Sequence, residues 1–154
     1  MIFTPFKPVQ LPKRLIYSSA GETKMFSTES GNVLGYIKFN SIRDFGDKFK
    51  DKAGSKSLYI NDLFVPQCYR GQGVGRALVN HAKRASEIRG AEGNLHLVAY
   101  NVDHPGKPPH KFYRKIGFTT GSKEYDAIID EAIKNNEPIP AMFTQGTDMF
   151  FRNI

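Results

Sequence analysis

The chain is most constrained by a strand-like segment that leads directly into a glycine-rich turn and then into a helix-like segment. Residues 57–65 are rich in β-branched and aromatic side chains, and Pro66, which has no amide hydrogen to donate, ends that pattern. Three glycines follow at alternate positions, and apolar residues then recur at helical spacing over residues 76–88. The sequence therefore predicts a strand, a glycine turn and a helix in immediate succession.

The glycine turn has the features of an anion site. Gly71, Gly73 and Gly75 would let the backbone adopt positive φ and let a ligand approach with no Cβ in the way. The first amides of the following helix have no partner within the helix, and the helix dipole is positive at that end. Arg70 and Arg76 flank the glycines and supply fixed positive charge suited to phosphate oxygens. We therefore expect a diphosphate group to bind here.

The spacing of the glycines separates this turn from two common nucleotide signatures. The third glycine placement of the dinucleotide fingerprint is missing, and no Gly-Lys-Ser/Thr of a P-loop follows. The segment does match Arg/Gln-x-x-Gly-x-Gly/Ala, and it resembles the acetyl-CoA binding motif of the GCN5-related N-acetyltransferase (GNAT) family. Residues 59–65 are similar to the central strand of that family, and residues 112–118 to its Tyr-x-Lys-x-Gly-Phe helix end. The resemblance covers about residues 57–118.

The resemblance implies that an acetyl group passes from acetyl-CoA to a primary amine by direct attack. Tyr113 stands where the family places a general acid that protonates the departing CoA thiolate. A phenol suits this role, because its ordinary pKa of about 10 keeps it protonated at neutral pH. The cofactor contacts that the resemblance implies come from the main chain of Leu63, Phe64 and Val65, from Arg70, Gly71, Gln72, Gly73, Val74, Gly75 and Arg76 in the turn and the first helical turn, and from Asn101.

The base that takes the proton from the amine is left open. Asn61 stands where members of the family that act on small amines often carry glutamate, and an amide is not a base. Strict alternation along the strand puts Asn61 on one face with Leu63, and Asp62 on the opposite face. The alternatives are His110, His104 or Asp103, which belong to a Pro/Gly-rich segment longer than the family usually shows, or a water held by Asn61 and Tyr59.

We expect a single domain over residues 1–154, with an α/β fold of the α+β three-layer sandwich type. Its central sheet should be mixed, mostly antiparallel and flanked by helices, as in the family. Only residues 19–23 separate the first two predicted strands, so the N-terminal helical region should be shortened. Residues 122–135 predict an added amphipathic helix with Ser122 as its N-cap, and residues 141–144 and 147–152 a closing hairpin.

The formal charge of +7 does not decide which partner, if any, binds the basic surface. Part of the basicity is explained by attraction of the phosphates of CoA, because two basic clusters, residues 83–89 and 107–115, lie beside the proposed cofactor site. A nucleic-acid or acidic protein partner is left open, and so is a homodimer. The alternative function is a non-catalytic or weakly active acyl-CoA-binding module that recognises an acidic partner through this basic surface.

Cysteine usage and hydropathy bear on the compartment. One cysteine excludes an internal disulfide framework and fits a reducing compartment. No apolar run approaches the roughly 18 residues of a membrane span, and no cluster of metal-ligating residues stands out. We therefore expect a cytoplasmic protein without a metal. The sequence does not indicate which amine is acetylated or which acyl chain is preferred.

Overall fold

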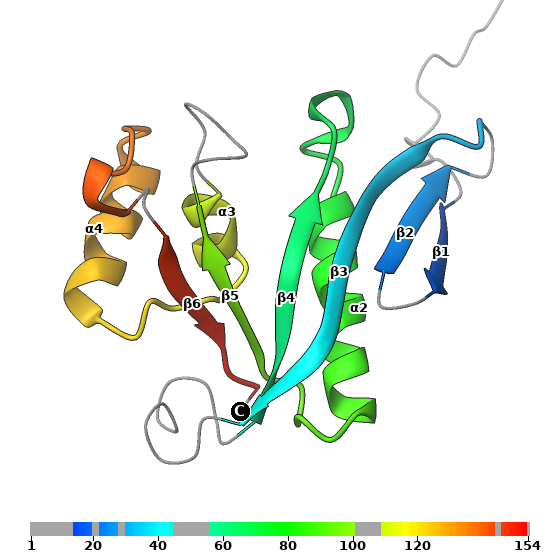
Figure 1. The fold of residues 1–154 in the computed structure, drawn as a ribbon. Coiled ribbons are helices and arrows are strands. Elements are labelled where there is room, and N and C mark those ends of the chain that lie inside the picture. Colours follow the sequence, from blue (N-terminus) through cyan, green and yellow to red (C-terminus); the bar gives the residue numbers. More distant parts are fainter. Residues whose placement is uncertain are drawn as a thin grey trace, which may run out of the picture.

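The computed structural model describes residues 14–19, 22–27, 30–44, 56–100, 109–143 and 146–153. In this part of the chain the strands form one six-stranded sheet in the order β1-β2-β3-β4-β5-β6 (Figure 1). Its strands are β1 (Arg14–Ser19), β2 (Glu22–Ser27), β3 (Val33–Asp44), β4 (Lys56–Phe64), β5 (Leu95–Ala99) and β6 (Thr147–Phe151).

The sheet is mixed and mostly antiparallel, as predicted. Neighbouring strands run antiparallel except β4 and β5, which are parallel. A parallel pair needs a crossover, and α2 (Val74–Ile88) provides it between β4 and β5. At the N-terminal side, β1 ends at Ser19 and β2 begins at Glu22, so these strands follow each other without a helix between them.

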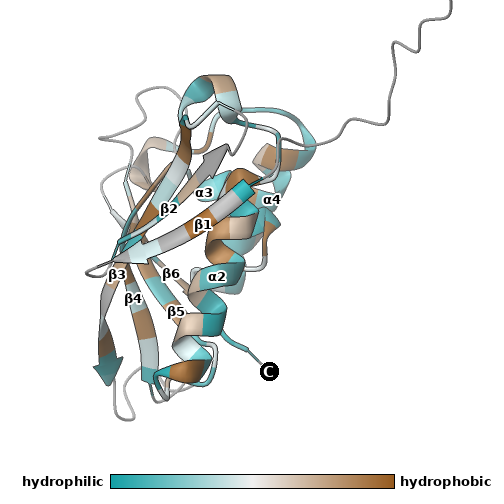
Figure 2. Ribbon diagram, turned by 90° about the vertical axis from the view of Figure 1, so that its right-hand side faces the viewer, coloured by the Kyte–Doolittle hydropathy of each residue, from teal (hydrophilic) through white to brown (hydrophobic). Residues whose placement is uncertain are grey.

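Helix α2 covers the sheet over β3 and β4. Leu78, Val79 and Ala82 lie on its buried face, and they join residues such as Leu58 and Ile60 of β4 in the main hydrophobic core. Figure 2 shows α2 with bands of apolar and hydrophilic residues, as expected for an amphipathic helix. Burial of the apolar band therefore holds α2 against the strand that precedes its glycine turn.

The C-terminal part adds two short elements and one longer helix. They are α3 (His110–Lys115), α4 (Lys123–Lys134) and the 3₁₀ turn η2 (Ala141–Phe143); a further 3₁₀ turn, η1 (Gln67–Tyr69), precedes the glycine turn. The Ser122 hydroxyl caps α4 by accepting a hydrogen bond from the Tyr125 amide, as predicted. Helix α4 and η2 share a small core of their own, formed by Ile129, Ala132, Ile139 and Phe143.

The predicted closing hairpin is wrong. Residues 141–143 form η2, in which the Phe143 amide donates to the Pro140 carbonyl, and the Phe143 side chain packs into the α4 core. Strand β6 pairs with β5 instead. The pairing is favoured because Met149 of β6 is buried in the main core beside Leu97 of β5, an apolar contact that a local hairpin would not supply.

The approach of α2 to the sheet depends on Gly35 of β3. A Cβ at this position would lie 2.9 Å from the Phe64 carbonyl oxygen, 3.0 Å from Cγ1 of Val74 and 3.2 Å from Cδ1 of Leu78. A backbone oxygen cannot move aside as a side chain can, so Gly35 lets the sheet and the first turn of α2 come into contact.

We expect Gly35→Ala to destabilise the fold by about 1–3 kcal/mol, the usual cost of overpacking a core. The midpoint of urea unfolding should fall with little change in the m-value. Val33→Ala on the same strand is the matched control, because Val33 is 38% exposed and its truncation should cost less. An equal loss in both variants would contradict the packing argument.

Candidate active site

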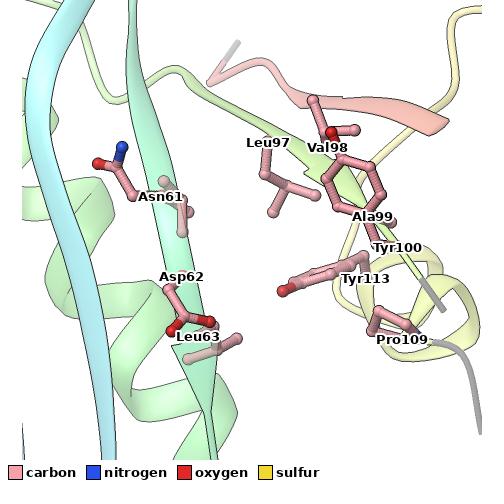
Figure 3. Close-up of a pocket in the computed structure, with 10 residues that line it drawn as sticks. Asn61, Asp62, Leu63, Leu97, Val98, Ala99, Tyr100, Pro109 and Tyr113 are labelled. Atoms are coloured by element: carbon pink, nitrogen blue, oxygen red, sulfur yellow. The ribbon is translucent and has the colours of Figure 1, made fainter. Parts of the chain in front are cut away.

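A pocket opens where β4 and β5 diverge (Figure 3). In the described part, the backbone pairing of these strands is limited to Leu58 with Leu95 and Tyr59 with His96. Beyond those pairs the pocket occupies about 400 Å³, counting the portion open to solvent. It is lined by Ile60, Asn61, Asp62 and Leu63 of β4, by Leu97, Val98, Ala99 and Tyr100 at the end of β5, and by Pro109 and Tyr113 at α3.

A β-bulge in β4 changes which of its side chains share a face of the strand at this pocket. Pairing with β3 skips Asn61, which is left as an extra residue on β4. A bulge shifts the alternation of side chains by one position. Leu63 therefore packs against the same core as Ile60, although strict alternation predicted opposite faces.

The predicted orientation of Asp62 is consequently wrong. Its carboxylate is half-buried at the pocket and accepts a hydrogen bond of 3.0 Å from the hydroxyl of Tyr36 on β3. In Figure 3, the amide of Asn61 is directed away from Tyr113. Sequence reasoning missed Asp62 because a bulge depends on the pairing of β4 with β3, which the residues of β4 alone do not reveal.

Tyr113 faces β4 from the other side of the gap. Its side chain is 7% exposed, and its hydroxyl points toward β4 (Figure 3). The rings of Phe112 and Phe118 lie beside it, each with a centroid 5.4 Å from that of Tyr113. Burial raises the pKa of the Tyr113 phenol well above its ordinary value, and the nearby charge of Asp62 raises it further. The hydroxyl therefore stays protonated well into the alkaline range and can act as a proton donor.

Two of the three glycines in the glycine turn have the positive φ that the sequence predicts. Gly71 and Gly73 have φ of 78° and 79°, and no atom lies within 4 Å of an added Cβ at either one. Gly73 is the N-cap of α2, so the first helical amides open onto this turn.

Gly75 has a different role from the one predicted. It lies inside α2, where a Cβ would be 2.9 Å from the ring of Phe112 on α3. This glycine therefore provides the close contact between α2 and α3 and does not supply a positive φ.

Two arginine side chains fix the turn through main-chain carbonyls. Arg70 Nε donates to the carbonyl of Val65 at 2.9 Å, and Nη2 of Arg14 on β1 donates to the carbonyl of Gln72 at 2.6 Å. The Gln72 side chain donates to the Cys68 carbonyl at 3.4 Å. Arg14 lies far from the turn in sequence, and no local pattern indicated its contact. The arrangement leaves a pre-shaped turn, with Arg76 exposed on the first turn of α2.

The structure excludes His110 as a base. Its side chain is 0% exposed, and its Nε2 lies 2.7 Å from the carbonyl oxygen of Phe143. Because a carbonyl only accepts, Nε2 carries the proton, and His110 has no access to a substrate amine. His96 of β5 is 7% exposed and lies 3.0 Å from a carboxylate oxygen of Asp148. Asn101, Asp103 and His104 lie outside the described residues.

Among the described residues, no group of three or more His, Cys, Asp or Glu side chains could hold a metal ion. None of the helices described is both long and apolar enough to cross a membrane.

Comparisons with known proteins show which family and which relatives this chain is similar to. A family model for the acetyltransferase (GNAT) domain matches residues 22–120. Streptothricin acetyltransferase from Streptomyces lavendulae is 39% identical over 66 residues, which are 43% of this chain and 33% of that protein.

Solved structures share the fold. Nourseothricin acetyltransferase matches with a TM-score of 0.51 and 24% identity, over 84% of this chain and 63% of that one. A putative streptothricin acetyltransferase from Bacillus anthracis, solved in complex with acetyl coenzyme A, matches with a TM-score of 0.52 and 18% identity, over 88% and 65%. The chain thus spans a third of the curated relative and less than two thirds of these structures. Because the family model covers more than half of it, the chain belongs to the GNAT acetyltransferase family.

Proposed function

We propose that this protein transfers an acetyl group from acetyl-CoA to a primary amine by direct attack. The observation that carries the proposal is the pocket between β4 and β5, which is lined by the Asp62 carboxylate on one side and the Tyr113 phenol on the other. A proton acceptor and a proton donor thus lie on facing elements of one pocket. Such an arrangement suits a reaction that takes one proton from the nucleophile and gives one to the leaving group.

The donor half of the proposal rests on α2 and the free edge of β4. The first amides of α2 and the exposed backbone at Gly71 and Gly73 would hold the pyrophosphate, with Arg76 adding positive charge. Because β4 and β5 diverge, the main chain of residues 63–65 faces the extended pantetheine arm on the β5 side, although the Val65 carbonyl also accepts a hydrogen bond from Arg70. The Bacillus anthracis protein of the same fold was solved with acetyl-CoA, which supports this ligand.

The chemical step then needs two proton transfers within the pocket. The bound ammonium first loses one proton to solvent, and Asp62 accepts the second proton from the nitrogen as the neutral amine attacks the thioester carbonyl carbon. The carbon–sulfur bond of the tetrahedral intermediate breaks as the new carbon–nitrogen bond is retained, and Tyr113 gives its proton to the departing thiolate. Tyr36 holds the Asp62 carboxylate in place through its hydroxyl. We assign Asn61 only the holding of water at the mouth of the pocket.

The acceptor is a primary amine whose positive charge is attracted by Asp62. Streptothricin and nourseothricin belong in the first substrate panel because related proteins bear those names. Small amines, peptides and aminoacylated RNA complete the panel. A cytoplasmic location, a homodimer and a nucleic-acid partner stay predictions from the sequence.

Acetyl-CoA at 100 times its Kd should stabilise the fold by about 2.7 kcal/mol, which corresponds to a rise in Tm of roughly 5–10 °C. Thermal unfolding with acetyl-CoA, CoA and ATP measures this, and ATP should give the smallest shift. Gly73→Ala is the matched control, since it strains the N-cap of α2 and should weaken the shift. No shift with the unmodified protein would exclude the donor assignment, and a shift without turnover on any amine would favour the binding module.

Tyr113→Phe should lower turnover by roughly 10- to 1000-fold while acetyl-CoA affinity changes little, because the general acid is lost and the ring is kept. The raised pKa of Tyr113 gives a second expectation. The proton donor is lost only as pH rises through the pKa, so turnover should show no alkaline fall centred at or below about pH 10. An unchanged rate in Tyr113→Phe would show that Tyr113 is a packing residue of the core and not the general acid.

Asp62→Asn should lower turnover by roughly 10²- to 10⁴-fold at neutral pH, because the amide keeps the shape but cannot take a proton. Steady-state kinetics with a saturating amine measures the effect. Asp148→Asn is the matched control, since Asp148 is exposed on β6 and contacts His96 outside the pocket. If Asp62→Asn kept turnover within about threefold of the unmodified protein, Asp62 would not be the base.

A further inference from the structure

The helix that carries Tyr113 is too short to be stable without tertiary contacts. Helix α3 has six residues, and its N-cap, Pro109, makes no side-chain capping bond. Isolated helices shorter than about 12 residues are marginal in water, so tertiary contacts must fix α3. Its position matters because both Pro109 and Tyr113 line the pocket.

A buried hydrogen bond ties the first residue of α3 to η2. His110 is 0% exposed, and its Nε2 donates to the Phe143 carbonyl at 2.7 Å. The hydroxyl of Thr147, at the start of β6, lies 3.2 Å from the same nitrogen and itself donates to that carbonyl at 2.6 Å. The first turn of α3 therefore meets η2 and the start of β6, more than 30 residues further along the chain, at one carbonyl oxygen.

A buried histidine at position 110 lowers the free energy of unfolding unless its hydrogen bond to the Phe143 carbonyl compensates. The other ring nitrogen, Nδ1, is buried and has no hydrogen-bond partner among the described residues. A buried acceptor without a partner destabilises a fold, and an apolar side chain would fill the same volume without that cost. What histidine provides is a neutral N–H donor, and burial favours the neutral form by lowering the pKa of His110.

A second link, at the other end of α3, runs to α4. Arg114 donates to both carboxylate oxygens of Asp130, at 2.9 and 3.2 Å, and to the Phe118 carbonyl at 3.0 Å. This ion pair is partly exposed, so it contributes less than the buried bond of His110. Asp130, Phe143 and Thr147 all lie beyond residue 120, where the match to the family model ends.

We propose that His110 is a positioning residue that fixes Tyr113 at the pocket by tying the first turn of α3 to η2, so that the C-terminal segment braces the acid-bearing helix. The proposal rests on the proposed role of Tyr113 as the proton donor. His110 and Tyr113 are neighbours on one face of the helix at i and i+3. The Tyr113 amide donates to the Pro109 carbonyl at 3.1 Å, so fraying of the first turn would displace Tyr113 directly.

A pair of amide substitutions tests whether the hydrogen bond from His110 to the Phe143 carbonyl holds α3 in place. In His110→Gln the side-chain amide nitrogen can reach the place of Nε2, whereas in His110→Asn it reaches only the place of Nδ1. We expect His110→Asn to lower kcat by roughly 10- to 100-fold, since a displacement of about 1 Å can cost that much, with a change of less than about threefold in acetyl-CoA affinity. His110→Gln should restore most of kcat.

Amide hydrogen exchange gives a readout that does not need turnover. The amides of Tyr113 and Ile116 donate within α3, to the carbonyls of Pro109 and Phe112. Their exchange should become faster in His110→Asn and stay near the unmodified rate in His110→Gln. Thr147→Val is the second variant if His110→Asn yields too little folded protein. It removes the Thr147 hydroxyl that donates to the Phe143 carbonyl and keeps the His110 imidazole, so the same changes should appear at smaller amplitude.

The control separates positioning from general loss of stability. Met25→Ala creates a cavity in the core at β2 and should lower Tm, yet kcat well below Tm and local opening of α3 should not change. Unmodified kcat and exchange in His110→Asn would overturn the proposal, as would a kcat loss in Met25→Ala of the same size. If Tyr113→Phe kept full turnover, the proposed role of Tyr113 as the proton donor would fail, while the exchange data would still decide whether His110 holds α3.

Discussion

The bulge at Asn61 is the constraint on which the candidate site depends. Strand β4 must satisfy two demands, since Ile60 and Leu63 both pack into the main core while a polar group has to face the gap toward β5. A regular strand cannot place residues three apart on one face, because its side chains alternate with period two. One extra residue resolves this, and it brings Asp62 to the pocket. The hydroxyl of Tyr36 on β3 then holds the carboxylate.

Two helices complete the site, and their contact joins its two halves. Helix α2 presents its N-terminus at the glycine turn, and α3 carries the phenol. They meet where Phe112 lies against Gly75, so the same short motif shapes the glycine turn and positions the helix of Tyr113. The segment after residue 120 holds α3 from the other side, through the buried bond of His110 and the ion pair of Arg114. A small helix is thereby placed by neighbours on both sides.

Much of this fold could be predicted because its signals are local. The glycine turn, the amphipathic helix over residues 76–88 and the capped helix after Ser122 each follow from residue types within a few positions. The orientation of Asp62 could not be predicted, since it depends on how β4 pairs with β3. His110 was misjudged for a related reason. Its place between proline-rich and basic residues favoured an exposed loop, yet η2 and β6, distant in sequence, bury it.

The sequence by itself determined the family and the order of strand, turn and helix, because these follow from short-range backbone preferences and spacing. That the start of α2 holds an anion stays a prediction from the same residues. Only the tertiary structure decided which carboxylate faces the phenol of Tyr113 and which histidine is buried. The strand register and the packing of distant segments set the direction and the burial of a side chain, and both properties decide whether it can exchange a proton with a substrate.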